Sequence, residues 1–330
     1  GLKFIIDGKG ITQEELEIVK NGKNLNRSNI GKEVIAKSNY ISDAVNIIGK
    51  LKKTQHVTVD IGGGSAKKIA PKLLQEIGCH VETINDELDE CSRGPDPTSD
   101  GLMKLISKTK NVGFAFDLDS DRVILVMNGE KKSSDITLGL GVVKAIKLGI
   151  KKFVLSIDSS LAVEKYIIKH GGEVWRSKVG ESNVIQMMIK NNADAGGEGS
   201  SGGFILKKFN MCRDGLLTSG LIASMIDDES IQKDIEFFES FSQIRNKVSI
   251  KSSLHDKVII EMIKKVEKEY KIDQLDGIKI NINENTWSLI RKSNTEDIIR
   301  VSTESNDNQL LHKIQSEMIK KVESCYEKIK

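Results

Sequence analysis

Residues 56–84 read HVTVDIGGGSAKKIAPKLLQEIGCHVETI, and residues 152–176 read KFVLSIDSSLAVEKYIIKHGGEVWR. Both stretches contain a strand-like run, a loop of small residues, an amphipathic helical pattern, a glycine and a second strand-like run. A glycine at the end of a helix is typical of a left-handed C-cap, after which a strand can begin at once. These strand–helix–strand units predict repeated α/β domains with mixed, largely parallel sheets.

The rest of the chain differs from this repeat. Residues 2–22, LKFIIDGKGITQEELEIVKNG, look like a third and incomplete copy of the unit. Two stretches read as connectors, at 227–233 and 241–249, and Pro95-Asp96-Pro97 predicts a turn before a helix that begins near Ser99. A C-terminal α+β domain is predicted by a helical pattern at 256–270, strand-like runs at 277–283, 286–291 and 298–303, and a long helix from about 308 to 330.

Composition excludes several classes of protein. The 330 residues include 50 basic and 47 acidic ones, so the net charge of +3 gives no reason to expect a nucleic-acid or membrane partner. The four cysteines are scattered, without C-x-x-C spacing, and read as reduced thiols rather than as a zinc site or disulfides. The reduced thiols therefore indicate a cytoplasmic protein. Either a monomer or a homodimer is expected.

Residues 112–126, VGFAFDLDSDRVILV, carry the strongest chemical signal. Asp117, Asp119 and Asp121 alternate in a loop between two strand-like runs and are followed by Arg122. Three carboxylates without a nearby His or Cys suit a hard cation such as Mg²⁺. A solvated acidic turn is the simpler alternative, but two tight strands leave it little room. A calcium-binding EF-hand is rejected, because its glycine and its final glutamate have no counterparts here.

Two further loops are rich in polar residues. Residues 195–204, AGGEGSSGGF, combine glycines with Glu198, Ser200 and Ser201, which could bind sugar hydroxyl groups; a flexible loop tip is an equally good reading. Residues 291–300, RKSNTEDIIR, form a turn between two strand-like runs, and their arginines suit a phosphate group, although a hairpin turn with incidental polar residues is the alternative. The polar side chains of this turn are Arg291, Ser293, Asn294, Thr295 and Arg300.

A rival signal lies at residues 60–65, DIGGGS. This loop follows a strand and opens a helix, where phosphate can bind, and it resembles the phosphate loop of the actin and sugar-kinase ATPases. That reading needs a second Asp-Gly-rich phosphate loop and an adenosine motif. Neither is found in the sequence, so an actin-like ATPase is the less favoured hypothesis.

Taken in order, the motifs resemble those of the α-D-phosphohexomutase family, which includes phosphomannomutase, phosphoglucomutase and phosphoglucosamine mutase. DLDSDR at 117–122 resembles the family's metal loop, with Leu118 and Ser120 in place of glycines. RSKVG at 176–180 resembles an element whose lysine lies near the reacting sugar. GEGSSG at 197–202 resembles the sugar-recognition loop, RDG at 213–215 the motif that follows it, and the turn after Arg291 the phosphate loop, without its two prolines.

The resemblance implies an isomerase that interconverts hexose 1-phosphate and hexose 6-phosphate through a phosphoserine and a bisphosphate intermediate; the hexose would be mannose, glucose or glucosamine. It implies that Asp117, Asp119 and Asp121 hold Mg²⁺, that Arg122 steadies the transferring phosphate, and that Lys178 and Lys3 are acid/base candidates. Glu198 with Ser200 or Ser201 would bind ring hydroxyls, and the 291–300 turn the other phosphate. The expected domains are a remnant of a first α/β domain (1–40), a metal-loop α/β domain (41–134), a sugar-recognition α/β domain (135–245) and a C-terminal α+β phosphate-binding domain (246–330).

One family element has no counterpart in these residues. The family's phosphorylated serine lies in a Thr-Ala-Ser-His-Asn-Pro type loop shortly before a segment that resembles Gly1-Leu2-Lys3, and no later stretch resembles that loop. We expect an N-terminally truncated mutase that binds sugar phosphate without turnover. A non-catalytic, sugar-phosphate-binding relative is the alternative.

Overall fold

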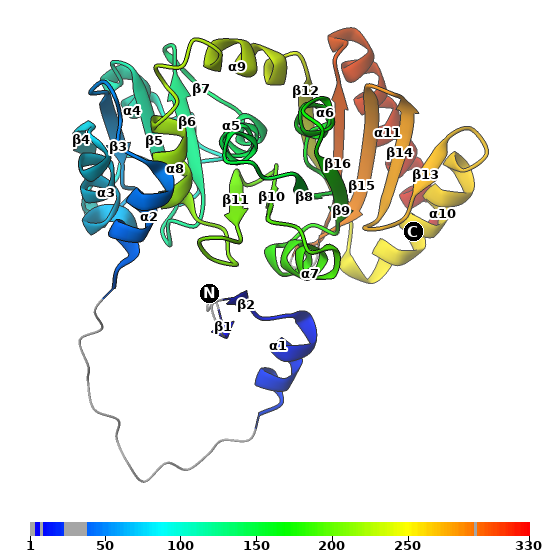
Figure 1. The fold of residues 1–330 in the computed structure, drawn as a ribbon. Helices are drawn as coiled ribbons and strands as arrows, with labels where there is room; N and C mark the ends of the chain where they lie inside the picture. Colours follow the sequence, from blue (N-terminus) through cyan, green and yellow to red (C-terminus); the bar gives the residue numbers. More distant parts are fainter. Residues whose placement is uncertain (1–3, 7–8, 23–37, 294–295) are drawn as a thin grey trace.

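Three β-sheets of four or five strands follow one another along the chain and lie side by side in the computed structural model, which describes residues 4–6, 9–22, 38–293 and 296–330 (Figure 1). The first sheet is drawn on the left in blue and cyan, the second in green at the centre, and the C-terminal sheet in orange on the right. The predicted fold class, repeated α/β domains followed by an α+β domain, is confirmed.

The first sheet has the strand order β4-β3-β5-β6-β7. β3 is parallel to both β4 and β5, whereas β5–β6 and β6–β7 are antiparallel. The direction changes because the aspartate loop, residues 117–122, turns the chain straight back from β5 into β6. The strands are β3 (His56–Asp60), β4 (His80–Ile84), β5 (Val112–Phe116), β6 (Val123–Met127) and β7 (Glu130–Lys131).

The helices of this part begin and end at residues that explain their bounds. α3 ends at Gly78, whose φ of +109° is the left-handed conformation predicted there, and β4 follows at once. α4 begins at Met103 rather than near Ser99, because Asp100 first forms a turn by accepting the N–H of Leu102 at 2.8 Å. The helices are α2 (Tyr40–Ile48), α3 (Ala70–Ile77) and α4 (Met103–Lys108), with 3-10 turns η1 (Ser65–Lys68) and η2 (Leu88–Glu90).

The second sheet has the order β11-β10-β8-β9, with β8 parallel to β9 and β10, and β10 antiparallel to β11. Its buried side chains and those of the first sheet form one continuous core, which α5 and α8 help to fill. The strands are β8 (Lys152–Ser156), β9 (Glu173–Ser177), β10 (Ala195–Glu198) and β11 (Gly203–Leu206); the helices are α5 (Ser134–Lys147), α6 (Leu161–Lys169), α7 (Glu181–Asn191), α8 (Gly215–Ala223) and α9 (Ile231–Glu239).

The C-terminal sheet is antiparallel throughout, in the order β12-β16-β15-β14-β13, and has a core of its own with α10 and α11. Alternate side chains of β15 point to opposite faces of the sheet. Ile290 and Val301 pack on the helices, while Trp287 and Leu289 pack against Ile157 of the second part. The elements are β12 (Ser242–Ser249), η3 (Ser252–Leu254), α10 (His255–Val266), β13 (Lys271–Asp273), β14 (Ile278–Asn283), β15 (Thr286–Lys292), β16 (Ile298–Ser305) and α11 (Asn308–Ile329).

β12 corrects one prediction. Residues 241–249 were expected to be a connector, but Ser242–Ser249 pairs with β16 over eight consecutive positions. The sequence misleads because the helix-facing positions include Asn246, whose side chain is bonded by Gln315, while Arg245 and Lys247 occupy the opposite face. A strand with polar residues on both faces lacks the alternation by which strands are recognised.

The N-terminal segment forms a small hairpin and a helix. β1 (Ile5–Ile6) pairs with β2 (Lys9–Gly10) in antiparallel fashion, and α1 (Gln13–Lys20) follows. Thr12 and Glu15 cap α1 reciprocally, as a capping box does. The predicted strand and helix are therefore present, but the strand pairs with a hairpin partner rather than in a parallel unit.

Candidate functional site

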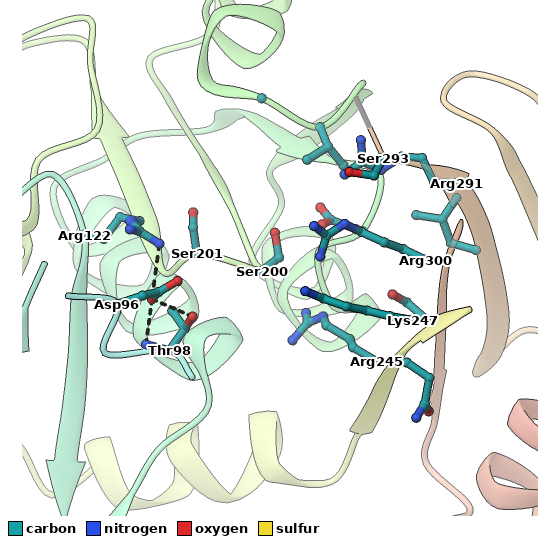
Figure 2. A pocket seen from close by; sticks show the side chains of 16 residues that line it. Asp96, Thr98, Arg122, Ser200, Ser201, Arg245, Lys247, Arg291, Ser293 and Arg300 are labelled. Carbon is teal, nitrogen blue, oxygen red and sulfur yellow. Dashed lines mark hydrogen bonds and ion pairs between the residues drawn. The ribbon is translucent and has the colours of Figure 1, made fainter. Parts of the chain in front are cut away.

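A cavity of about 540 Å³ lies where the three sheets meet. Arg122 reaches it from the aspartate loop, Ser200 and Ser201 from the β10–β11 turn, and three residues from the C-terminal sheet: Arg291, Ser293 and Arg300. Figure 2 shows Arg122 and both serines facing the cationic side chains of that sheet across the opening. Six site residues predicted from three separate motifs thus line one space.

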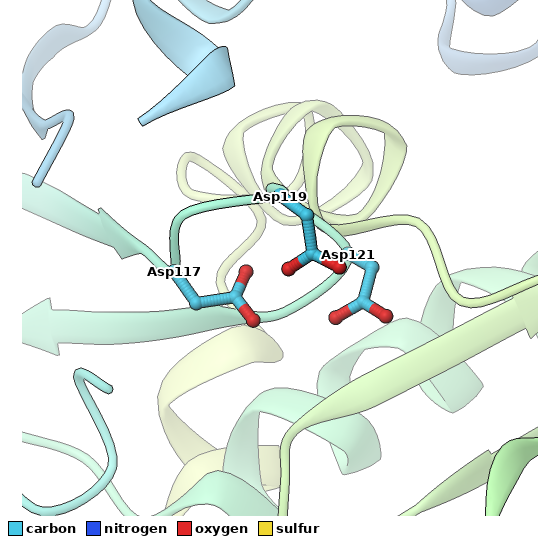
Figure 3. A group of neighbouring side chains, drawn as sticks. All are labelled: Asp117, Asp119 and Asp121. Atoms are coloured by element: carbon cyan, nitrogen blue, oxygen red, sulfur yellow. The ribbon is translucent and has the colours of Figure 1, made fainter. Parts of the chain in front are cut away.

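The aspartate loop brings its carboxylates together. One oxygen each of Asp117, Asp119 and Asp121 lies within 4.8 Å of the others (Figure 3). Asp117 and Asp121 are buried, whereas Asp119 is exposed. Burial raises the pKa of Asp117 to about 6, against the opposing effect of Arg122, whose Nε donates to Asp117 Oδ2 at 2.6 Å. Oxygen donors at this spacing fit a hard divalent cation.

The loop at residues 60–65 supports the aspartate loop from behind. The N–H of Ser65 donates to the carbonyl of Leu118 at 2.9 Å, and the Ser65 and Ser120 hydroxyls are 2.8 Å apart. Gly64 is required because a Cβ there would lie 2.7 Å from the Leu118 carbonyl oxygen. Ser120 has a φ of +62°, a backbone conformation that favours glycine. Glycine is the usual residue at this position in the metal loop that the sequence resembles. The glycine-rich loop that resembles a phosphate loop thus holds the aspartate loop through Ser65, and Gly64 allows the close approach.

Arg93, which belongs to none of the sequence motifs, joins these two loops. It donates to Asp60 Oδ2 at 3.0 Å and to the carbonyl of Phe116 at 2.6 Å, directly before Asp117. Both charged side chains are only 2% exposed. Arg93 thereby fixes the end of β5 from which the aspartate loop starts.

Arg213 connects the aspartate loop to the sugar-recognition loop. Its guanidinium donates to Asp121 Oδ2 and to Glu198 Oε2, both at 2.7 Å. Burial alone would lower the pKa of Arg213, but the carboxylates of Glu198 and Asp121 outweigh burial and raise it. The RDG motif pointed to this arginine, although no role was predicted for it.

Glu198 lies behind the cavity wall. It is 3% exposed, and its second oxygen accepts the N–H of Gly180 at 2.6 Å. Burial raises the pKa of this carboxyl, and Arg213 opposes that rise. Lys178 is exposed and is not among the cavity-lining residues, although Val179 and Gly180 beside it are.

The C-terminal sheet supplies a row of cations. Ser293 closes the β15–β16 turn by donating its N–H to the carbonyl of Ile298 at 3.0 Å, and Arg291 and Arg300 face each other across these strands. Arg245 and Lys247 of β12 also line the cavity, and both were missed because β12 was read as a connector. Asn294, Thr295 and Lys3 lie outside the described residues.

Two acidic residues of the cavity were also missed. Asp96, in the predicted Pro-Asp-Pro turn, lies 3.4 Å from Arg122 Nη1 and accepts both the N–H and the hydroxyl of Thr98. Asp158, between β8 and α6, is buried and accepts the Ser156 hydroxyl at 2.6 Å. Asp158 lies in the small-residue loop of the second strand–helix–strand unit.

Buried polar contacts fix the C-terminal sheet against the second part. Glu304 accepts the N–H of Leu161 at the start of α6 and the indole N–H of Trp287, at 2.8 and 2.7 Å. Lys279 donates to the carbonyl of Ile157 and lies 4.3 Å from the Trp287 ring centroid. Burial lowers the pKa of Lys279 to about 7.

Within the described part of the chain, none of the helices combines the length and the apolar character needed to cross a membrane.

Comparison with protein-family models gives three matches in order along the chain. Residues 38–130 match phosphoglucomutase/phosphomannomutase alpha/beta/alpha domain II, residues 135–241 match domain III, and residues 250–321 match the C-terminal domain of the same proteins.

Individual proteins agree with these matches. The phosphoglucosamine/phosphogalactosamine mutase of Sulfurisphaera tokodaii is 30% identical over 336 residues, covering 94% of this chain and 72% of the relative. The phosphoglucosamine mutase of Methanocaldococcus jannaschii is 30% identical over 271 residues, covering 77% and 60%. A phosphoglucomutase/phosphomannomutase family protein of Burkholderia thailandensis has the same fold, with a TM-score of 0.73 at 21% identity, covering 86% of this chain and 64% of that one. The chain spans 60–64% of the length of three such curated relatives.

Proposed function

The chain belongs to the α-D-phosphohexomutase family, and on that premise we propose that it binds a hexose phosphate for interconversion of the 1- and 6-phosphates. The observation that carries the proposal is the single cavity shared by Arg122, the Ser200–Ser201 turn and the arginines of the C-terminal sheet. Phosphoryl transfer depends mainly on positioning and on neutralising charge. A cavity with cationic groups at two ends and hydroxyl groups between them suits a sugar with phosphate at either end.

We propose that Asp117, Asp119 and Asp121 hold one Mg²⁺. The spacing of their oxygens and the lack of nitrogen or sulfur donors among them support this ion. When bound, Mg²⁺ would neutralise negative charge on the phosphoryl group. Arg122, anchored to Asp117, would direct its remaining N–H groups toward the same group. Arg213 and Arg93 would act as positioning residues, because each grips the aspartate loop or the strand that leads into it.

At the other end, we propose that Arg291, Ser293 and Arg300 bind the phosphate that does not react, with Asn294 and Thr295 of the same turn. Ser200 and Ser201 line the cavity between these two ends and would bind hydroxyl groups of the sugar ring. Glu198 would orient the loop through Gly180 and Arg213, and reach the sugar only if one of those bonds opened. Lys178 stays a proposed acid/base that must turn inward.

Glucosamine phosphate is the proposed first substrate, because the curated relatives cited above are phosphoglucosamine mutases. We also propose that these 330 residues bind the sugar phosphate without turning it over, since none of their segments resembles the phosphoserine loop. We also propose that domain boundaries lie near residues 134 and 245, between the metal-loop, sugar-recognition and C-terminal domains.

Calorimetric titration of the 330-residue chain in the presence of Mg²⁺ tests this function. Glucosamine 6-phosphate, glucose 6-phosphate and mannose 6-phosphate should bind, glucosamine 6-phosphate most tightly, while free glucosamine should bind far more weakly. The variant Arg122→Gln should weaken binding of the phosphates. Equal affinity for free and phosphorylated sugars would overturn the proposal. Turnover of a hexose 1-phosphate by this chain would overturn the inactivity alone.

A further inference from the structure

Three cationic side chains lie in one row across the C-terminal sheet. The strand register places Lys247 of β12 opposite Arg300 of β16, and Arg300 opposite Arg291 of β15. All three line the cavity, and Figure 2 shows Lys247 and Arg300 extending side by side toward Ser200. Directly opposed residues have Cβ atoms about 4.5–5.5 Å apart. The three positively charged side chains therefore start from adjacent positions on three neighbouring strands.

Such a row is unfavourable unless negative charge lies nearby, because like charges directly opposite each other destabilise a strand pair. Arg291 has Asp276, with Nε 3.8 Å from a carboxylate oxygen. Lys247 and Arg300 share one carboxylate: Glu296 Oε1 lies 3.3 Å from Lys247 Nζ, and Oε2 lies 2.5 Å from Arg300 Nη2. Glu296 is thus the carboxylate that pairs with both Lys247 and Arg300.

The ion pairs of Glu296 are weak enough for a bound phosphate to replace its carboxylate. The side chains of Lys247 and Glu296 are 57% and 44% exposed, and that of Arg300 is 39% exposed. Ion pairs with this exposure contribute little to stability, since water screens them. A phosphate dianion carries more charge and more acceptor oxygens than a carboxylate, and arginine binds it in bidentate fashion.

We propose that Lys247 is a phosphate-binding residue, acting with Arg291 and Arg300, and that Glu296 competes with the substrate phosphate for Lys247 and Arg300. The inference rests on the proposed function, because it requires the C-terminal sheet to receive a phosphate. Glu296 offsets part of the positive charge of the row in the free protein, and it lowers the affinity for phosphate by the strength of its own two ion pairs.

Two opposite effects follow. Lys247→Gln removes one cation and should weaken binding, whereas Glu296→Gln removes the competitor and should strengthen it. Because exposed pairs are worth up to about 1 kcal/mol, each change should be roughly two- to fivefold in Kd. The gain from Glu296→Gln should shrink in the double variant, since one of the two cations that Glu296 occupies is then absent.

The experiment is a titration of the 330-residue chain with glucose 6-phosphate and, separately, with inorganic phosphate. It compares Lys247→Gln, Glu296→Gln, the double variant and Arg291→Ala. Lys257→Gln and Glu267→Gln serve as matched controls for net charge; both residues are exposed and lie on or at the end of α10, which packs on the opposite face of the sheet. Circular dichroism verifies that every variant is folded.

A weaker Kd for Lys247→Gln, a tighter Kd for Glu296→Gln and a smaller gain in the double variant support the inference, provided that both controls match the wild type. If Arg291→Ala weakens binding while the Lys247 and Glu296 variants behave like their controls, the inference is wrong and the proposed phosphate site stands. If no variant alters binding, or the wild type binds neither ligand, the phosphate site itself is wrong and the inference fails with it.

Discussion

The two ends of the cavity hold their charges in opposite ways. At the aspartate loop, Arg213 is 19% exposed and its partner Asp121 only 8%, and both take part in a network that continues to Glu198. At the C-terminal sheet, Lys247 and Glu296 are 57% and 44% exposed. Buried, paired charges fix the position of a loop, whereas exposed pairs remain available to a ligand. The pairs at the first end hold the aspartate loop in position, whereas those at the second end can be replaced by a ligand.

The largest effect should come from breaking the buried network. Arg213→Met would leave Asp121 and Glu198 without their shared cation, and removing one partner of a buried ion pair typically costs about 3–5 kcal/mol. Urea unfolding should show this loss of stability. Arg300→Met, which breaks an exposed pair, is the matched control. Similar losses for the two variants would erase the distinction between the ends.

Metal binding should depend on Asp119, the exposed carboxylate of the aspartate loop. Asp119→Ala removes one proposed ligand without opening the core, so the fold should be kept. We expect the Kd for Mg²⁺ to rise by more than about 100-fold, because even outer-shell partners of metal ligands are worth roughly 10- to 100-fold. Isothermal titration measures this, with the exposed Asp227→Ala as control. Unchanged Mg²⁺ affinity would refute the metal assignment.

Substrate binding should depend on the exchangeable end. Arg291→Ala removes a charged donor from the proposed phosphate site, and hydrogen bonds to charged groups are worth about 1.5–3 kcal/mol. The Kd for hexose 6-phosphate should therefore rise roughly 10- to 100-fold. Lys292→Ala is the adjacent control, since Lys292 pairs with Asp256 and does not line the cavity. Equal Kd values for the two variants would contradict the site.

A pH dependence should arise at Lys279, which donates to the carbonyl of Ile157 where the C-terminal sheet meets the second part. The pKa of Lys279 is about 7 in the folded protein, against 10.5 for an ordinary lysine. Below pH 7 both states are protonated, and between pH 7 and 10 the unfolded chain binds more protons, so stability rises with pH by at most about 1.4 kcal/mol per unit. Lys279→Met should lose this slope in urea unfolding between pH 7 and 9. Parallel curves for the two proteins would show that Lys279 is protonated when folded.

The sequence predicted what depends on local pattern. The strand–helix–strand units, the C-terminal α+β part and the convergence of Asp117, Asp119 and Asp121 follow from hydrophobic periodicity and from short-range spacing. The alternation of apolar and polar residues could not identify β12, because both of its faces carry polar residues. Arg245 and Lys247 line the cavity, while the side chain of Asn246 accepts a hydrogen bond from Gln315 of α11. A polar strand of this kind is recognised only once its partner strand is known.

Long-range partners were the second thing that the sequence could not provide. Glu198 was assigned to the sugar by its motif, yet its carboxylate accepts from Arg213, fifteen positions later, and from Gly180. Arg93 reaches Asp60 across thirty-three positions. Neither pairing has a spacing rule, because each depends on how separate strands are placed side by side.

The smallest effect on stability should come from Lys247, and this makes it the sharpest test of the contrast between the two ends. Lys247→Gln breaks one exposed ion pair and also relieves repulsion from Arg300 opposite, so the free energy of unfolding should change by less than about 1 kcal/mol, in either direction. Any change should diminish further in 1 M salt, where the Debye length is about 3 Å. The proposed effect of the same substitution on phosphate affinity should persist at low salt. A loss of stability comparable to that of Arg213→Met would mean that Lys247 is structural, and that the C-terminal end of the cavity is as fixed as the aspartate loop.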